Sequence, residues 1–372
     1  MSTTESFAFY YPRLDIGGVQ HSLVLIANEL HRRGYPVSFI LWEKGGREFE
    51  RLNTDINVII PDHASTLRAI PSLTRYLLIE QPDYLLTRLE DPNVSATLAC
   101  FMPGVSTDPV PGEGSVSSPI GAEARLPDRI TRKVADIIYP NLDYFLVDST
   151  GMKRHVVDLF DIQQDAVDVC PPAVLERGFQ LKTPPSPHPF FEMDDPVVTS
   201  VGRLAPVKRY ELLIRAVAQL QDDLSPRLVI AGDGEEKSFL ADVATELDID
   251  GRVALPGSTD QPLQYMYHAD IFALTSRSEA FGIALVEALA CGTPVVATDV
   301  PYGPREILSG GTYGKLTGET PVAVANGIRE AYANNWDQTM LRNRASDFDV
   351  VSVTDTLLET LRNGSSTIRN QF

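Results

Sequence analysis

Two glutamates, Glu279 and Glu287, stand within the stretch S-E-A-F-G-I-A-L-V-E-A-L-A-C-G of residues 278–292. The second lies inside an apolar run that predicts a helix, and burying an unpaired carboxylate there costs several kcal/mol. Ligand hydroxyl groups would satisfy such a carboxylate by hydrogen bonding. We therefore interpret this segment as a small-molecule site.

The first turn of the same predicted helix offers backbone donors. The N–H groups of Phe281, Gly282 and Ile283 have no acceptor inside a helix that starts here, and helix N-termini bind oxygen-rich or anionic groups well. Buried strands are predicted on either side, at residues 269–276 and 295–298. The glutamates then follow the carboxyl end of a strand, where open α/β sheets bind ligands.

A second segment, G-R-L-A-P-V-K at residues 202–208, places two cations on a loop after a predicted strand. A departing diphosphate gains negative charge, which fixed cations or a metal must stabilise. Arg203 and Lys208 are the candidate cations. The alternative is that both side chains merely solvate a surface loop.

Two pairs of glycines are candidates either for phosphate binding or for tight turns. Gly17 and Gly18 open a predicted helix, and Gly232 and Gly234 follow a predicted strand. Glycines allow a phosphate to approach the backbone closely, but a tight turn explains them as well.

The elements that must position these residues alternate between strand and helix in both halves of the chain, which predicts two doubly wound α/β domains. One sheet of the first half is expected to contain strands at residues 6–11, 36–42, 84–87 and 144–149. The stretch 103–127, rich in Pro, Gly and Ser, is expected to be a long irregular loop for acceptor recognition or a lid.

The domain boundary is expected at a Pro-rich segment. Residues 183–195 predict a stiff linker between a first domain at 1–182 and a second at 196–345. The last segment, 346–372, contains a further predicted helix.

Composition excludes several classes of protein. A chain of 372 residues with 43% hydrophobic residues is long enough for two cores. Its three cysteines, Cys100, Cys170 and Cys291, lie far apart, which favours a reduced cytoplasmic protein. No apolar run reaches the roughly 18 residues of a membrane span, and no signal peptide is evident. The net charge of −18 argues against nucleic acid as a partner.

The charged residues are unevenly chosen, because lysine is rare against arginine and aspartate outnumbers glutamate. High salt screens the self-repulsion of such a surface. A halophilic source and a moderately acidic mesophile both remain open.

With E-x-F-G before it and A-x-G-x-P-V-V-A after it, the Glu-x7-Glu pair resembles the motif of the retaining nucleotide-sugar glycosyltransferases of family four, also called glycosyl transferases group 1. The G-R-x-x-x-x-K loop at 202–208 and the glycine-rich stretch from Gly17 to Gly34 match the same family. The resemblance covers nearly the whole chain and is weak at residues 91–131.

The resemblance implies the GT-B fold, in which two Rossmann-like domains face a cleft and the last helix crosses back onto the first domain. The donor is then a UDP- or GDP-sugar, used with retention and without metal or another cofactor. Glu287 would bind ribose hydroxyls and Glu279 those of the sugar, while Arg203 and Lys208 would bind the diphosphate. Gly18 and Gly17 would contact phosphates, and Gly232 and Gly234 would line the donor site.

The acceptor implied is a glycan, linked to lipid or protein, in cell-envelope or glycoprotein assembly on the cytoplasmic side. A cationic helix face formed by Arg125, Arg129, Arg132 and Lys133 is a candidate for peripheral contact with a membrane, although a solvated face that pairs with acids explains it too. Many family members carry a histidine near the donor sugar. The corresponding region here, about residues 100–106, has none.

Other functions remain as alternatives. An epimerase or hydrolase acting on nucleotide sugars can share this fold, and a catalytically silent glycan-binding scaffold is the alternative without enzymatic activity. A dehydrogenase would need G-x-G-x-x-G after its first strand, which is absent. Two D-x-D tripeptides, at 248–250 and 347–349, follow no convincing strand, and we interpret them as solvated surface.

Overall fold

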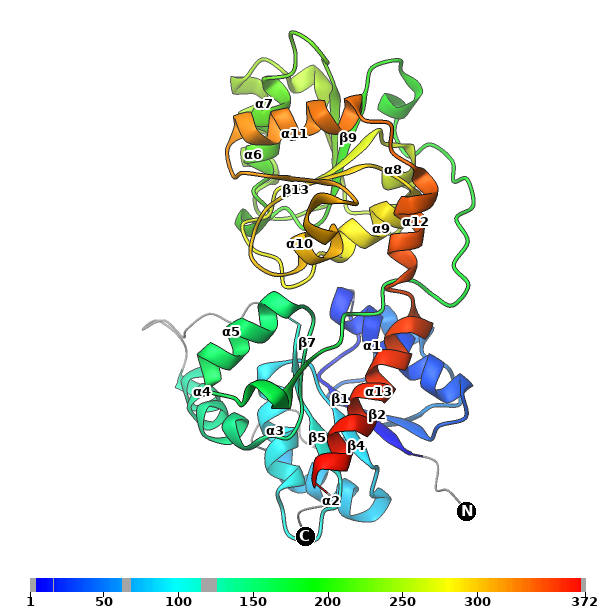
Figure 1. The fold of residues 1–372 in the computed structure, drawn as a ribbon, viewed down its shortest axis with the longest axis vertical. Helices are drawn as coiled ribbons and strands as arrows, with labels where there is room; N and C mark the ends of the chain where they lie inside the picture. The colour runs from blue at the N-terminus through cyan, green and yellow to red at the C-terminus, as the bar shows by residue number, and fades with distance from the viewer. Residues whose placement is uncertain (1–4, 16, 62–67, 115–125, 369–372) are drawn as a thin grey trace. The chain divides into compact units, whose positions relative to one another are not determined.

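The computed structural model of this chain describes residues 5–15, 17–61, 68–114 and 126–368. It divides into two compact units: unit 1 comprises residues 1–177 and 349–372, and unit 2 comprises residues 178–348 (Figure 1). Every sheet in them pairs its strands in parallel, which confirms the predicted α/β class. Among the described residues, no helix is both long and apolar enough to cross a bilayer.

The main sheet of unit 1 has the strand order β3-β2-β1-β4-β5. Its strands are β1 (Phe7–Tyr11), β2 (Val37–Leu41), β3 (Asn57–Ile59), β4 (Tyr84–Leu86) and β5 (Asp108–Val110). The order reverses between β1 and β4. The loops that follow these two strands therefore flank the position where open α/β sheets bind ligands.

The first strand shows why this sheet is covered on both faces. All five residues of β1 are buried. Phe7, Phe9 and Tyr11 pack into one apolar cluster, and Ala8 and Tyr10 pack into another, because successive side chains of a strand point to opposite faces. The first cluster is completed by α1 (Gly18–Arg32) and α13 (Val350–Ile368), and the second by α2 (Ile70–Glu80) and α3 (Glu90–Cys100).

The segment after α3 corrects two expectations. Residues 108–113, expected within an irregular loop, form β5 and then β6 (Gly112–Glu113). β5 pairs with β4, whereas β6 pairs with β7 (Phe145–Val147) in a separate three-stranded sheet completed by β8 (Val167–Val169). The strand predicted at 144–149 thus belongs to a second sheet, in which the carbonyl of Pro111 accepts from the N–H of Leu146 at 2.9 Å. Acceptor recognition or a lid was expected for the whole stretch 103–127, of which residues 115–125 lie outside the described residues.

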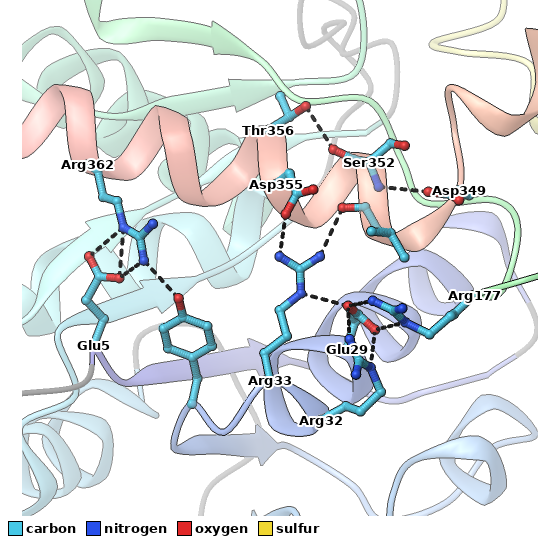
Figure 2. Close-up of polar contacts among 12 residues, drawn as sticks. Glu5, Glu29, Arg32, Arg33, Arg177, Asp349, Ser352, Asp355, Thr356 and Arg362 are labelled. Atoms are coloured by element: carbon cyan, nitrogen blue, oxygen red, sulfur yellow. Dashed lines mark hydrogen bonds and ion pairs between the residues drawn. The ribbon is translucent and has the colours of Figure 1, made fainter.

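Helix α13 packs against α1 through its apolar face and through a network of charges (Figure 2). Arg33, at the end of α1, donates to the carbonyl of Val351 at 3.1 Å and pairs with Asp355. At its other side Arg33 pairs with Glu29 at 2.7 Å. Farther along α13, Arg362 pairs with Glu5 at 2.8 Å.

Glu29 is the centre of this network. Its carboxylate also accepts two hydrogen bonds each from Arg32 and Arg177, at 2.7–3.1 Å, although its side chain is only 3% exposed. Burial alone would raise the pKa of Glu29, but the bonds from the arginines hold the pKa far below its usual value. Arg177 is the last residue of unit 1 before the chain enters unit 2. The carboxylate therefore joins this end of the first segment of unit 1 to α1.

Unit 2 has one six-stranded sheet in the order β11-β10-β9-β12-β13-β14. Its strands are β9 (Val197–Val201), β10 (Arg227–Ala231), β11 (Val253–Gly257), β12 (Ile271–Leu274), β13 (Val295–Thr298) and β14 (Lys315–Thr317). Its helices are α6 (Tyr210–Ala218), α7 (Lys237–Glu246), α8 (Pro262–His268), α9 (Ile283–Cys291), α10 (Gly303–Ile307), α11 (Pro321–Ala333) and α12 (Gln338–Ser346). Here the order reverses between β9 and β12, so the loops after these strands, residues 202–208 and 275–282, flank the ligand position.

The Pro-rich segment expected as a linker packs on unit 2. Thr183 and Tyr267 are within hydrogen-bonding distance, 3.1 Å, and the carbonyl of Pro184 lies 2.8 Å from Nε2 of His268. Phe190 and Phe191 pack against the core of unit 2.

Candidate functional site

Two of the predicted site residues, 71 positions apart, meet at the switch point of unit 2. The ammonium group of Lys208 donates to Oε1 of Glu279 at 2.6 Å, and the hydroxyl of Ser276 donates to the same oxygen at 2.6 Å. Both side chains of the ion pair are partly exposed. The pair therefore places one cation and one carboxylate where a ligand can reach both.

The backbone around the pair is held by contacts between the two loops. Thr275 donates to the carbonyls of Lys208 and Arg209, and the N–H of Arg277 donates to the carbonyl of Val207 at 2.8 Å. Glu279 forms a β-bridge with Tyr302, in the loop after β13. The loops after three neighbouring strands thus fix the position of the Lys208–Glu279 pair.

Packing explains Gly232 and Gly234 without a ligand. A Cβ atom on Gly232 would lie 1.8 Å from the carbonyl oxygen of Gly202, and one on Gly234 would lie 2.3 Å from that of Leu204. Any side chain would therefore push the Gly202–Lys208 loop away. These two glycines support the loop that carries the candidate cations.

Arg203 lies on the same loop and is exposed. Within the described part of the chain it makes no ion pair, unlike Lys208. Arg209, which ends the loop, is instead bound to Glu319. Arg203 is therefore a charged group at this loop that remains available to an anion.

Helix α9 presents its N-terminus to the same region. Its N-cap is Gly282, with φ at +108°, a left-handed conformation that favours glycine and provides no capping side chain. Phe281 packs its ring edge-on against Phe348, and the whole residue is only 3% exposed. Ile283 is the first residue of the helix. The structure thus places the three predicted backbone donors together at one helix end.

The expectation that Glu287 is a buried carboxylate was wrong. Its side chain is half-buried rather than enclosed in an apolar core, although its neighbours Val286 and Ala288 are buried. An isolated run of apolar letters does not show which face of α9 points outward. The residue remains a candidate because it lies on the helix that starts at the switch point.

In unit 1 the predicted glycines lie at the N-terminus of α1. Gly17 is the N-cap, in extended conformation and without a capping side chain, and Gly18 is the first helical residue. His21, in the first turn, pairs with the buried Glu48 at 3.0 Å. Burial favours a raised pKa for Glu48, but the contacts with His21 and Arg51 lower it.

Sequence reasoning missed a charged cluster at the carboxyl ends of three strands of unit 1. Arg88 follows β4, Glu113 ends β6 and Asp148 follows β7, and all three are buried. Arg88 pairs with Asp148 at 3.2 Å. Burial raises the pKa of Asp148 to about 6, although Arg88 opposes the shift. A Cβ on Gly114 would lie 3.0 Å from Val19, so this cluster is next to the first turn of α1.

The region expected to correspond to the family's histidine, residues 100–106, follows a helix and not a strand. Residues 100–106 cover the end of α3 and the turn before β5, at the amino end of the strand. The carboxyl end of β5 is Val110, and Glu113, only 2% exposed, ends the next strand, β6. The available signal was a charged residue within two positions of the end of each strand, but the strands at 108–110 and 112–113 were not predicted.

The predicted basic helix face is smaller than expected. Helix α4 (Leu126–Ile138) buries Arg132, which pairs with Glu90 and Asp136 and lies over the ring of Phe160. Arg129 and Lys133 are exposed. Arg125 lies outside the described residues.

The D-x-D tripeptides have local roles. Asp347 pairs with Arg344 at 2.7 Å, and Asp349 accepts from the N–H of Ser352 at the start of α13. Asp248 adopts a left-handed turn conformation after α7. Within the described ranges, no group of three or more acidic, His or Cys side chains is arranged to hold a metal ion.

Two family models match this chain, one in each unit. A family model described as "Glycosyl transferases group 1" matches residues 186–348, and one described as "Glycosyltransferase Family 4" matches residues 16–175. The lipopolysaccharide core biosynthesis glycosyltransferase LpsE of Rhizobium meliloti is 29% identical over 357 residues, 93% of this chain and 96% of that protein. An N-acetylgalactosaminyltransferase of Campylobacter jejuni that acts on a diphospho-undecaprenol-linked sugar is 28% identical over 290 residues, 75% of this chain and 73% of that one.

Solved structures show the same fold. A glycosyltransferase of Rickettsia africae has a TM-score of 0.76 at 16% identity, over 97% of this chain and 98% of that one. Anabaena HepE, crystallised with UDP and glucose, has a TM-score of 0.74 at 21% identity, over 96% and 100%. The likeness extends over both units, and it confirms the predicted GT-B fold.

Proposed function

The chain belongs to glycosyltransferase family four, and from that membership we propose a specific reaction: transfer of a hexose from a UDP-sugar to a lipid-linked glycan. That it is a nucleotide-sugar-dependent glycosyltransferase follows from the family. The base, the acceptor and the roles of individual residues are the proposal. The observation that carries it is the Lys208–Glu279 pair beside the exposed Arg203 at the switch point of unit 2.

In this proposal the donor binds to unit 2. Lys208 and Arg203 bind the diphosphate and stabilise the charge that grows on it as the bond to the sugar breaks. The N–H groups of Phe281, Gly282 and Ile283 bind oxygens of the donor at the start of α9. Glu279 accepts hydrogen bonds from sugar hydroxyls and keeps Lys208 in place, and Glu287 accepts them from the ribose.

The proposal includes retention of anomeric configuration and reaction without a divalent cation. Two positive side chains on the loop after β9 can supply the charge that a metal would otherwise provide. Glu279 already binds Lys208 and Ser276, so we assign it no nucleophilic role. The leaving phosphate then accepts the proton of the acceptor hydroxyl.

Support for a uridine nucleotide comes from the solved relatives. Anabaena HepE has been crystallised with UDP, with UDP and glucose together, and with UDP-glucose. Support for a lipid-linked acceptor comes from the Campylobacter jejuni and Rhizobium meliloti relatives, which act on an undecaprenol-linked sugar and in lipopolysaccharide synthesis. We place the acceptor on unit 1, beside Gly17, Gly18 and the Arg88–Asp148 pair.

Calorimetric titration with UDP, GDP and ADP, without divalent metal and at low and high salt, tests the donor site. We expect UDP to bind, and Arg203→Ala and Glu287→Ala each to weaken binding by at least about tenfold, because each removes a charge-assisted hydrogen bond. Glu246→Ala, which removes an exposed carboxylate on α7, is the matched control. Tighter binding of GDP would overturn the uridine assignment, and wild-type affinity in both variants would overturn the site.

We also propose that α4 contacts an anionic membrane on the cytoplasmic side, where free cysteines persist. Cys100, Cys170 and Cys291 are all free and buried, as expected for a reducing compartment. Leu126, Ile130 and Ile137 are large exposed apolar residues of α4, on which Arg129 and Lys133 are exposed too. Such a helix face suits the surface of a bilayer with anionic lipids.

Vesicle sedimentation tests this contact. Binding to phosphatidylglycerol-containing vesicles is expected at low salt, and Ile137→Asp should weaken it severalfold by placing a charge on the apolar stripe. Val322→Asp changes another exposed apolar residue, in unit 2, and should bind as the wild type does. Equal binding of the two variants would count against α4 as the contact.

A further inference from the structure

A pocket of about 380 Å³ lies in unit 2 at the amino ends of β12 and β13. The ends of α8, α9 and α11 and the start of α12 line it, and these elements are neighbours in Figure 1. Lys208 and Glu279 follow the carboxyl ends of β9 and β12. Because β9, β12 and β13 run parallel, these two residues lie at the other ends of the strands from the pocket. The pocket is therefore separate from the candidate donor residues.

Three aromatic side chains line this pocket, and two are held in fixed positions. The indole N–H of Trp336 donates to the carbonyl of Ala331 at 2.9 Å. Tyr267 has its hydroxyl 3.1 Å from that of Thr183, and its ring meets His268 edge-on at 5.1 Å. The third, Tyr332, is 46% exposed, which is unusual for a large ring. Aromatic faces of this kind pack against the C–H groups of sugar rings.

The polar groups of the pocket suit a neutral ligand. Its charged lining residues are one anion, Asp270, and one cation, Arg342. Arg342 donates to the carbonyl of Cys291 at 3.1 Å and to Gln338 at 3.2 Å, which fixes its guanidinium group. The C-terminal ends of three helices meet here, and such ends provide carbonyl acceptors and disfavour anions. Hydroxyl groups donate to acceptors of this kind.

We propose that this pocket is a second carbohydrate-binding site, which binds a neutral oligosaccharide. Its volume falls within the range of about 300–1,000 Å³ found for small-molecule sites. The statement that this glycan is an acceptor or product of the enzyme rests on the proposed function. The statement that the pocket binds a glycan does not. Holding a glycan here raises the local concentration of its growing end.

Tryptophan fluorescence tests the proposal directly. The chain has two tryptophans, Trp42 in unit 1 and Trp336 in the pocket, so Trp42→Phe leaves Trp336 as the reporter. The probes are maltotriose, triacetylchitotriose and β-1,4-galactotriose, each titrated with and without saturating UDP. A saturable change in emission is expected with at least one of them, unaffected by UDP.

The variant Tyr332→Ala removes one aromatic face and should weaken that binding by about tenfold. Phe239→Ala, at an equally exposed ring on α7, should leave it unchanged. Thermal melts of both variants verify that they are folded. The proposal is overturned if no trisaccharide gives a saturable change, if the change survives Tyr332→Ala, or if UDP competes. UDP titration of the same samples reports separately on the donor site.

Discussion

Replacing Lys208 by methionine is expected to lower kcat/KM by about 10²–10³-fold, the usual effect of removing one donor that stabilises charge in a transition state. Methionine preserves much of the volume of the side chain, so the loss measures the charge. The control is Lys315→Met, which removes a lysine paired with Glu330 at 3.3 Å elsewhere in unit 2. Steady-state rates of sugar transfer or donor hydrolysis supply the measurement.

The contact between Lys208 and Glu279 makes the prediction sharper. If Glu279 acts partly by holding Lys208, then Glu279→Gln and Lys208→Met should not be additive in ΔΔG‡, because both remove the same interaction. The double variant is then less impaired than the product of the two single effects. Full additivity would mean that Glu279 acts on the sugar independently of Lys208.

A rate for Lys208→Met within about twofold of the wild type would contradict the assigned role. In that case Arg203 alone, or a metal ion, would have to stabilise the leaving group. Repeating the assay with added Mg²⁺ or Mn²⁺ separates these two explanations, since only the second predicts an increase in rate.

Glu29→Gln is expected to destabilise unit 1 by about 2–3 kcal/mol, because three arginines lose a shared, nearly buried acceptor. The value stays below that of a fully buried pair because Arg32 and Arg177 are half exposed and water can replace the carboxylate. The matched control is Asp355→Asn, which removes the exposed partner of Arg33 in the same network. That change should cost less than about 1 kcal/mol.

The effect of Glu29 also has a defined dependence on pH. The folded protein holds the pKa of this carboxyl far below its ordinary value of 4.5, so its stabilising contribution is fully present above that value. As the pH falls below about 4.5, the unfolded chain takes up the proton first and the contribution decreases. The stability difference between the wild type and Glu29→Gln should therefore shrink in acid.

Urea unfolding followed by the fluorescence of Trp42 measures this difference in unit 1, in a Trp336→Phe background that silences unit 2. A stability difference below about 0.5 kcal/mol near neutral pH would show that the network is an exposed cluster of little energetic value. A difference that grows in acid would contradict the sign argued from the arginine contacts.

Local patterns were enough to predict the inner strands of the three sheets, but not their edge strands. The strand predicted at 295–298 is β13 with the same bounds, and the strand predicted at 36–42 is β2, at Val37–Leu41. Runs of apolar residues between turns identify buried parallel strands because both faces of such a sheet are covered. The short, Pro-containing run at 108–113 carries no such pattern, and it was missed.

The sequence by itself determined the fold class, the family and the group of residues around the two switch points, because these follow from local periodicity and short motifs. Only the tertiary structure decided which side chains meet. It pairs Lys208 with Glu279, joins Arg177 to Glu29 across 148 positions, buries Arg132 and leaves Glu287 half exposed. Contacts between residues distant in sequence depend on how the loops after separate strands pack, and no single segment encodes that packing.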